Sequence, residues 1–220
     1  METWFEQTTG LTIACFVLED PGPFFVDPMV ENSRRVCQRT AYPQDGQFKG
    51  RPFLVATDWI QELKRRGIGK VLPLTPGNRE RFCQMQTALE QGLELVSAVH
   101  PSVSIQADAI IHPGVWINTG CHIGYKAEVE SGVIINTRTQ IDHHNFLERC
   151  SQLDPAVTTA GNVTLRECCH VHMGAIVINR LEIGADAIVG AGAVVIRDVP
   201  PGSTVVGVPA QAISYRRERT

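Results

Sequence analysis

The sequence lacks long apolar runs and a strong excess of charge of either sign. Its 220 residues contain no run of about 18 uninterrupted apolar residues, and no basic stretch followed by an apolar one opens the chain, so neither a membrane span nor a secretion signal is expected. The formal net charge is -3, with 20% charged residues, which gives no electrostatic reason to expect nucleic acid or an anionic membrane as a partner. We therefore expect a cytoplasmic protein that acts on small molecules.

The sequence also lacks cysteine pairs at metal-binding or redox spacings. Its seven cysteines include no CxxC pair, which favours thiols in a reducing compartment over disulfides or metal ligands. Hydrophobic residues make up 43% of the chain, enough for an ordinary buried core. These numbers predict a globular protein and leave its function open.

The first hundred residues alternate short apolar runs with stretches of helical spacing. This alternation predicts a small α/β domain over residues 1–100 with a mainly parallel sheet. Asn78 is a candidate N-cap for the second helix. The expected elements are a strand over Leu11–Leu18, a helix over Trp59–Arg66, a strand over Lys70–Leu74, a helix from Asn78 to about Gln91 and a strand over Leu93–Val99.

From Ile105 to Val195 an aliphatic residue recurs at every sixth position. Sixteen positions fall on this period, and fifteen of them are Ile, Leu or Val, with Thr159 as the exception. A period of six matches neither a helix nor a half-buried flat strand, but it fits a short strand plus a turn. It predicts a left-handed parallel β-helix over residues 101–198, in which three hexads make one triangular coil and the aliphatic side chains stack inward.

A stack of coils has two open ends, which must be covered. We expect the α/β domain to cover the first coil and residues 199–220 to form a C-terminal cap on the last. The repeat alone is also compatible with a scaffold that carries no chemistry.

Five segments of the repeat carry a resemblance to a known family. They are Gly132–Thr137, Ile141–His144, Gly161–Leu165, Ile183–Val195 and Val206–Ala210. On these segments the chain resembles the sialic-acid O-acetyltransferase and UDP-amino-sugar N-acetyltransferase group of bacterial hexapeptide-repeat acyltransferases. Gly-Val-Pro-Ala is common to many hexapeptide transferases, whereas Ile-Ile-Asn-Thr followed at fixed spacing by Asp-His is more specific.

The resemblance implies a homotrimer that takes acetyl-CoA as co-substrate and holds its sites between neighbouring chains. His143 matches the family's general base, because an imidazole is neutral near pH 7 and can accept a proton as the acceptor attacks the thioester. Asn136 matches an asparagine near the acetyl group, which positions the base or the acceptor.

Two positions depart from the family pattern. His144 follows the base where relatives usually carry an acidic residue, so Asp142 or a backbone carbonyl is expected to orient the imidazole instead. Gln152 stands nine residues after the base, where relatives often have a histidine that donates to the thioester oxygen. A glutamine amide can still donate that hydrogen bond.

The resemblance also carries over the positions that contact the pantetheine arm of the coenzyme. These are Gly161, Met173 and Ala191. Met173 and Ala191 are three hexads apart, which is one full coil, and therefore share a face, whereas His143 and Met173 are five hexads apart and do not. A site that uses both faces is most easily built from two chains of a trimer.

At the N-terminus the resemblance implies a truncated Rossmann-like domain on the sugar-nucleotide side. The sequence has no GxGGxA-like loop of the kind that holds the nucleotide in relatives, and it is expected to open inside the helix that follows this loop. Glu19 and Asp20 remain as nucleotide contacts or as simple turn residues.

The function that these residues predict is acetyl-CoA-dependent N-acetylation of an amino-deoxy sugar, nucleotide-linked, in surface glycan synthesis. The alternatives are O-acetylation of sialic acid or of another small hydroxyl acceptor such as serine, and a catalytically weakened trimeric scaffold. A third rival is a zinc site of the γ-class carbonic anhydrase kind, because His170 and His172 alternate along one strand. The Asn-Thr and Asp-His match favours the transferases, so no metal is expected.

Overall fold

The computed structural model describes residues 2–19, 46–48, 50–56 and 58–213. Residues 10–69 form one compact unit, and residues 3–9 together with residues 70 onward form a second. Residues 70–100, which the sequence pattern assigned to the N-terminal domain, therefore group with the repeat. The domain limits 1–100, 101–198 and 199–220 stay predictions.

The unit of residues 10–69 contains a small mixed sheet and one helix. Strand β1 (Phe16–Glu19) pairs parallel with β3 (Arg51–Ala56), and β2 (Gln47–Phe48) pairs antiparallel with β3. Helix α3 (Trp59–Arg65) begins after Asp58, whose side chain accepts a hydrogen bond from the Gln61 backbone N–H at 3.3 Å. The helix predicted over Trp59–Arg66 is α3, and of the strand predicted over Leu11–Leu18 only the part from Phe16 is strand, in β1; the sequence pattern did not predict β2 and β3.

The second unit contains most of α1 (Glu2–Thr9), a helix where the sequence was expected to open inside one, followed by β4 (Lys70–Val71), α4 (Asn78–Glu90) and β5 (Glu94–Leu95). Strands β4 and β5 pair in parallel. The N-cap of α4 is Gly77 and not Asn78, so the prediction that Asn78 caps this helix was wrong. The Asn78 amide instead donates to the carbonyl oxygens of Cys168 and Cys169 at 3.0 and 3.1 Å, and so ties the helix to the repeat.

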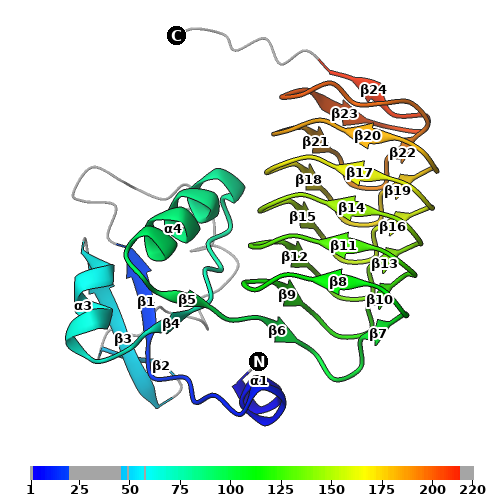
Figure 1. Cartoon of the computed structure of the whole chain (residues 1–220). Helices are drawn as coiled ribbons and strands as arrows, with labels where there is room; N and C mark the ends of the chain where they lie inside the picture. Colours follow the sequence, from blue (N-terminus) through cyan, green and yellow to red (C-terminus); the bar gives the residue numbers. More distant parts are fainter. Residues whose placement is uncertain (1, 20–45, 49, 57, 214–220) are drawn as a thin grey trace, which may run out of the picture. The chain divides into compact units, whose positions relative to one another are not determined.

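The repeat forms a parallel solenoid with three faces, each a ladder of mostly two-residue strands (Figure 1). We name each face by its central strand. The β12 face contains β6 (Ala98–Val99), β9 (Trp116–Ile117), β12 (Ile134–Ile135), β15 (Gln152–Leu153), β18 (His170–Val171), β21 (Ile188–Val189), β23 (Thr204–Val206) and β24 (Gln211–Ala212). The β13 face contains β7 (Ser104–Ile105), β10 (His122–Ile123), β13 (Gln140–Ile141), β16 (Thr158–Thr159), β19 (Ile176–Val177) and β22 (Val194–Val195). The β14 face contains β8 (Ile110–Ile111), β11 (Glu128–Val129), β14 (Phe146–Leu147), β17 (Thr164–Leu165) and β20 (Glu182–Ile183).

The pairing register confirms the predicted coil of three hexads. Ile135 of β12 stands opposite Leu153 of β15, and Leu153 stands opposite Val171 of β18. No helix in the described part of the chain is long and apolar enough to cross a lipid bilayer.

The second residue of each strand points into the solenoid and forms its core. From Ile117 to Val195 these residues are almost completely buried, and the exception in the pattern, Thr159, is buried as well. Its hydroxyl donates to the Gln140 carbonyl oxygen at 3.4 Å. Ile105 keeps the same register, opposite Ile123, but is 45% exposed because β7 is the end strand of its ladder and no further coil covers the side chain.

The corners of the coil repeat with the same period as the core. A residue with positive φ occurs at every sixth position from Asp108 to Gly192, and most of these residues are not glycine. A left-handed residue of this kind turns the chain sharply between two faces. His144, with φ of 56°, is one of them.

The stacked aliphatic core makes a direct prediction about stability. Replacing Leu165, which is fully buried in β17, with alanine should lower the free energy of unfolding by about 2–5 kcal/mol, since the close-packed coil cannot collapse around the cavity. The matched control is Ile110→Ala in β8, where the side chain is 53% exposed and a change within about 0.5 kcal/mol is expected. Urea denaturation followed by circular dichroism measures both, and equal losses would contradict the core assignment.

Candidate functional site

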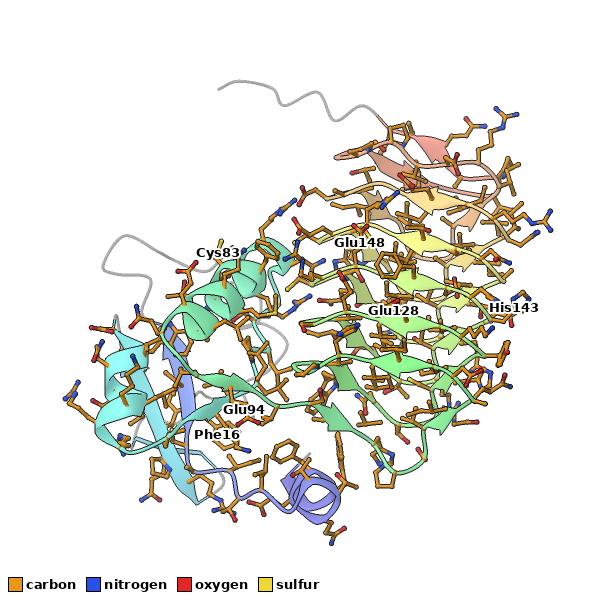
Figure 2. The ribbon with its side chains drawn as sticks, viewed as in Figure 1. Phe16, Cys83, Glu94, Glu128, His143 and Glu148 are labelled. Carbon is orange, nitrogen blue, oxygen red and sulfur yellow. The ribbon has the colours of Figure 1, made fainter. Side chains whose placement is uncertain are left out.

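His143 lies at the corner where the β13 face turns into the β14 face, which we call the His143 corner (residues 142–144). In Figure 2 its side chain projects from the edge of the solenoid. The backbone N–H of His143 donates to Asp142 Oδ1 at 2.7 Å. Beneath the corner, the buried Asn145 amide donates to the carbonyl oxygens of Asp142 and Ala160 at 2.6 and 3.0 Å. The exposed imidazole therefore stands on a rigidly hydrogen-bonded turn.

Glycine on the next coil makes room for the His143 ring. A Cβ atom added to Gly161 would lie 2.3 Å from Cε1, 2.5 Å from Nε2 and 2.9 Å from Nδ1 of His143, closer than nonbonded atoms approach. On the preceding coil, a Cβ on Gly124 would lie 2.5 Å from the Asp142 carbonyl carbon. Gly161 thus shapes the space occupied by His143, and its predicted contact with the pantetheine arm stays a prediction.

The imidazole of His143 is oriented by its neighbour His144. The two Nδ1 atoms lie 3.0 Å apart in a hydrogen bond. Asp142 does not take this role, because its carboxylate accepts from the backbone of His143, so the expectation that Asp142 or a backbone carbonyl would orient the ring was wrong. When His143 is the donor in this pair, its Nε2 carries a lone pair that can accept a proton.

His144 is itself held in place from the previous coil. Its backbone N–H donates to the Tyr125 carbonyl oxygen at 2.9 Å, and its ring meets the Tyr125 ring edge-on at 5.6 Å between centroids. Tyr125 precedes His143 by one full coil, so the Tyr125 ring and the two imidazoles are neighbours on adjacent coils. The sequence pattern did not single out Tyr125, although its one-coil spacing from His143 could have identified it.

The importance of the His144 contact can be tested with two substitutions at one position. His144→Ala removes the partner of His143 Nδ1 and should lower any turnover that depends on the His143 base by about tenfold, because the ring loses its fixed orientation. His144→Asn should retain most of the activity, since asparagine tolerates positive φ and its carbonyl oxygen accepts a hydrogen bond. Steady-state kcat/KM distinguishes the two variants, and equal activity in both would contradict an orienting role.

The remaining predicted residues gather at a different corner. Where the β12 face turns into the β13 face, the corner positions of successive coils contain Asn136, Asp154, His172, Met173 and Ala191, and we call this the Met173 corner. Gln152 of β15 points outward beside it. The Gly192 N–H donates to the Met173 carbonyl oxygen at 2.9 Å, which confirms that Met173 and Ala191 stack with an offset of one coil.

In one chain, then, the structure brings His143, His144 and Gly161 together and places Asn136, Gln152, Met173 and Ala191 at the other end of the β13 face. Asn136 precedes β13 and His143 follows it, so Asn136 does not position the base within its own chain. Met173 is 58% exposed. Both corners present side chains to the surroundings and are available to a neighbouring subunit or a ligand.

Gln152 is part of a hydrogen-bonded chain that starts at a buried arginine. Arg81 of α4 is fully buried and donates to the carbonyl oxygens of Gly132 and Cys150, each at 2.8 Å. It also lies 3.4 Å from Gln152 Oε1, and Gln152 Nε2 donates to Asp154 Oδ1 at 3.2 Å. The amide of Gln152 is thereby fixed with its NH2 group toward the Met173 corner. Sequence reasoning missed Arg81, because nothing in a helix pattern indicates that an arginine is buried.

Asp154 carries the most perturbed carboxyl group of this region. Burial opposes its ionisation, but contacts with His170, His172 and Gln152 outweigh the burial and hold the pKa of Asp154 well below its usual range. The group therefore remains a carboxylate at any ordinary pH. By linkage, the stability that it contributes is present above the ordinary pKa of an aspartate and is lost only in strong acid.

The other predicted positions are placed as follows. Glu19 ends β1, and Asp20 lies outside the described residues. The six described cysteines are free thiols. Burial raises the pKa of the Cys150 thiol to about 11 and that of Cys168 to about 12, so these two thiols are poor nucleophiles at neutral pH.

Comparison with known proteins gives the solenoid a biochemical context. No protein-family model matches the sequence. The crystal structure of PerB from Caulobacter crescentus, in complex with CoA and GDP-perosamine, is 31% identical, covers 90% of this chain and 97% of PerB, and has a TM-score of 0.75. The acetyltransferase domain of PglB from Neisseria gonorrhoeae, in complex with acetyl coenzyme A, is 26% identical over 79% of this chain and 84% of that domain, with a TM-score of 0.72.

Among curated proteins, the serine acetyltransferase of Salmonella typhimurium is 31% identical over 114 residues. The match covers 51% of this chain but only 40% of that enzyme, so the chain spans less than half the length of this relative.

The match to PerB combines 31% identity with coverage of nearly the whole of both chains. The chain belongs to the hexapeptide-repeat acetyltransferase family.

Proposed function

We propose that the protein transfers the acetyl group of acetyl-CoA to the amino group of an amino-deoxy sugar linked to a nucleotide, for surface glycan synthesis. The observation that carries this proposal is the match to PerB, a structure that holds CoA and GDP-perosamine, at 31% identity over 97% of its chain. The unit of residues 10–69 is then the part of the chain expected to face the nucleotide, with Glu19 and Asp20 as candidate contacts. We propose that this reaction takes place in the cytoplasm.

In the proposed mechanism His143 acts as general base. Its Nε2 atom takes a proton from the acceptor amine while the amine nitrogen attacks the thioester carbonyl carbon. The C–N bond forms, the C–S bond breaks, and the proton passes on to the leaving CoA thiolate. The hydrogen bond between His143 and His144 at 3.0 Å keeps the ring in the orientation that this transfer needs.

The proposal requires two chains to complete one site. His143 stands at one corner of the coil, whereas the predicted coenzyme positions Met173 and Ala191 and the predicted oxyanion donor Gln152 stand at or beside the other. We propose a homotrimer in which the His143 corner of one subunit faces the Met173 corner of the next. Analytical ultracentrifugation should give three times the mass of the chain, and a purely monomeric yet fully active protein would rule out this assembly.

Serine is the second acceptor that an observation favours. The serine acetyltransferase of Salmonella typhimurium matches half of this chain, but this match is confined to 114 residues and leaves most of the relative uncovered. Sialic acid and other hydroxyl acceptors are alternatives that rest only on the resemblance of the repeat to sialic-acid O-acetyltransferases. The amino-sugar proposal is preferred because its supporting match includes the residues that precede the repeat.

The experiment that tests the function is a comparison of acceptors. Purified protein is given acetyl-CoA with GDP-perosamine, other nucleotide-linked amino sugars, free serine or sialic acid, and the release of free CoA thiol is followed. We expect turnover with a nucleotide-linked amino sugar that exceeds turnover with serine by at least tenfold. Preference for serine or sialic acid would overturn the proposed acceptor, and no turnover with any acceptor would favour a trimeric scaffold.

A further inference from the structure

A second group of reactive side chains lies on the solenoid away from the His143 corner. His170 and His172 are two residues apart on and just after β18, so both side chains point to the same side of the β12 face. Asp154 follows the neighbouring strand β15 and precedes His172 by one full coil, which places the two residues on adjacent coils. One ligand atom from each of the three residues lies within 4.8 Å of the other two.

The donor atoms of this group lie about as close together as the ligand atoms around a single metal ion. His172 Nδ1 is 2.9 Å from Asp154 Oδ2, and His170 Nε2 is 3.1 Å from Asp154 Oδ1. Two ligand atoms on a tetrahedral Zn²⁺ ion are about 3.4 Å apart when each is about 2.1 Å from the metal. The three donors therefore need only small shifts to surround one ion.

One buried polar atom of the group, Nε2 of His170, lacks a hydrogen-bond partner among the described residues. His170 Nε2 is buried and makes no hydrogen bond in the structure, despite its closeness to Asp154 Oδ1. A buried ring nitrogen normally has a partner. A metal ion bound between the imidazole and the carboxylate would supply one.

The chemistry of the donors and of their surroundings also fits a metal ion. Two imidazoles and one carboxylate form a donor set used by Zn²⁺ and other divalent first-row ions. Gln152 donates to Asp154 Oδ1 at 3.2 Å and is itself contacted by the buried Arg81, an outer layer of the kind that orients metal ligands.

We propose that Asp154, His170 and His172 bind one divalent transition-metal ion, of which Zn²⁺ is the preferred species, through three protein ligands with a further position open to water. The side chains of the three residues are between 16% and 38% exposed, so an ion can enter from solvent. The proposed metal site does not depend on which molecule accepts the acetyl group.

The test is direct metal binding by the complete, unmodified chain. Protein freed of metal with a chelator is titrated with Zn²⁺ in a calorimeter and with Co²⁺ while visible absorption is recorded. We expect one ion per chain with a Kd in the micromolar range or tighter, and Co²⁺ bands of a four- or five-coordinate site. Less than about a fifth of an ion per wild-type chain, or a Co²⁺ spectrum identical to that of the hydrated ion, would overturn the proposal.

Variants locate the ion. His172→Ala and His170→Ala should each weaken binding at least tenfold, and Gln152→Ala should weaken it about tenfold through the outer layer. The matched control is His112→Ala, since His112 makes a similar pair with Glu128 at 2.8 Å on another face. Binding that is lost in the His112 variant and kept in the His172 variant would place the ion elsewhere. Because binding is measured without acceptor or acetyl-CoA, failure here leaves the proposed function standing, and failure of the acceptor assay leaves this site standing.

Discussion

Replacing His143 with alanine should lower kcat/KM for acetyl transfer by about 10²-fold or more, the amount that a positioned general base contributes. The ring is exposed at its corner, is held by the Nδ1 contact with His144 and has Nε2 available for the acceptor. Because the side chain contributes little to the core, the variant should keep the stability and assembly of the wild type. Steady-state kinetics of CoA release measures the effect.

His112→Ala is the control for the loss of a solenoid histidine. The side chains of His112 and its partner Glu128 are 41% and 39% exposed, so the contact between them contributes little to stability. The variant should therefore keep wild-type turnover. A His143→Ala variant that retained more than half of the wild-type kcat/KM would contradict the proposed mechanism, in which His143 is the general base.

The second large effect is expected from a single methyl group. Gly161→Ala would place a Cβ atom 2.3 to 2.9 Å from three atoms of the His143 ring, and the ring is the group that can move. We expect kcat/KM to fall by about 10- to 10²-fold, since a displacement of the base by about 1 Å is costly to catalysis. Circular dichroism should show an unchanged solenoid.

The control for this substitution is Gly69→Ala, where an added Cβ meets nothing within 4 Å and φ is not in the left-handed region. It should leave turnover unchanged. Full activity of Gly161→Ala would mean either that the ring swings to an equally productive position or that His143 is not the base. The His143→Ala result separates these two explanations.

Much of the repeat could be predicted because each coil contacts only the coil before it and the coil after it. An inward aliphatic at every sixth position requires each coil to stack on the next, so the register of Ile135 with Leu153 follows from counting. The same counting separates His143 from Met173 and predicts that they lie at different corners. Counting does not give the burial of Ile105, which is in register but exposed because the ladder ends at β7.

The residues that the sequence did not reveal depend on side-chain direction and on contacts between distant segments. Arg81 is buried because α4 packs so that its guanidinium reaches carbonyl oxygens of Gly132 and Cys150, far along the chain, and no local pattern contains this information. His144 took the orienting role expected of Asp142 because the Asp142 carboxylate turns back onto the backbone. Asp154 could have been identified from the sequence as a neighbour of His172, because the two residues are one full coil apart.

The left-handed residue at every sixth position limits how such a chain can change in length. An added segment of one or two residues would move different residues into the left-handed positions at the corners and turn the aliphatic row outward. One added hexad between His143 and Met173 would keep the core packed, yet would rotate everything downstream by a third of a turn and carry Met173 to a different face. Only whole coils can be gained or lost between these two residues without changing the corners of the coil that they occupy, so lineages of this fold should differ in that interval by multiples of three hexads.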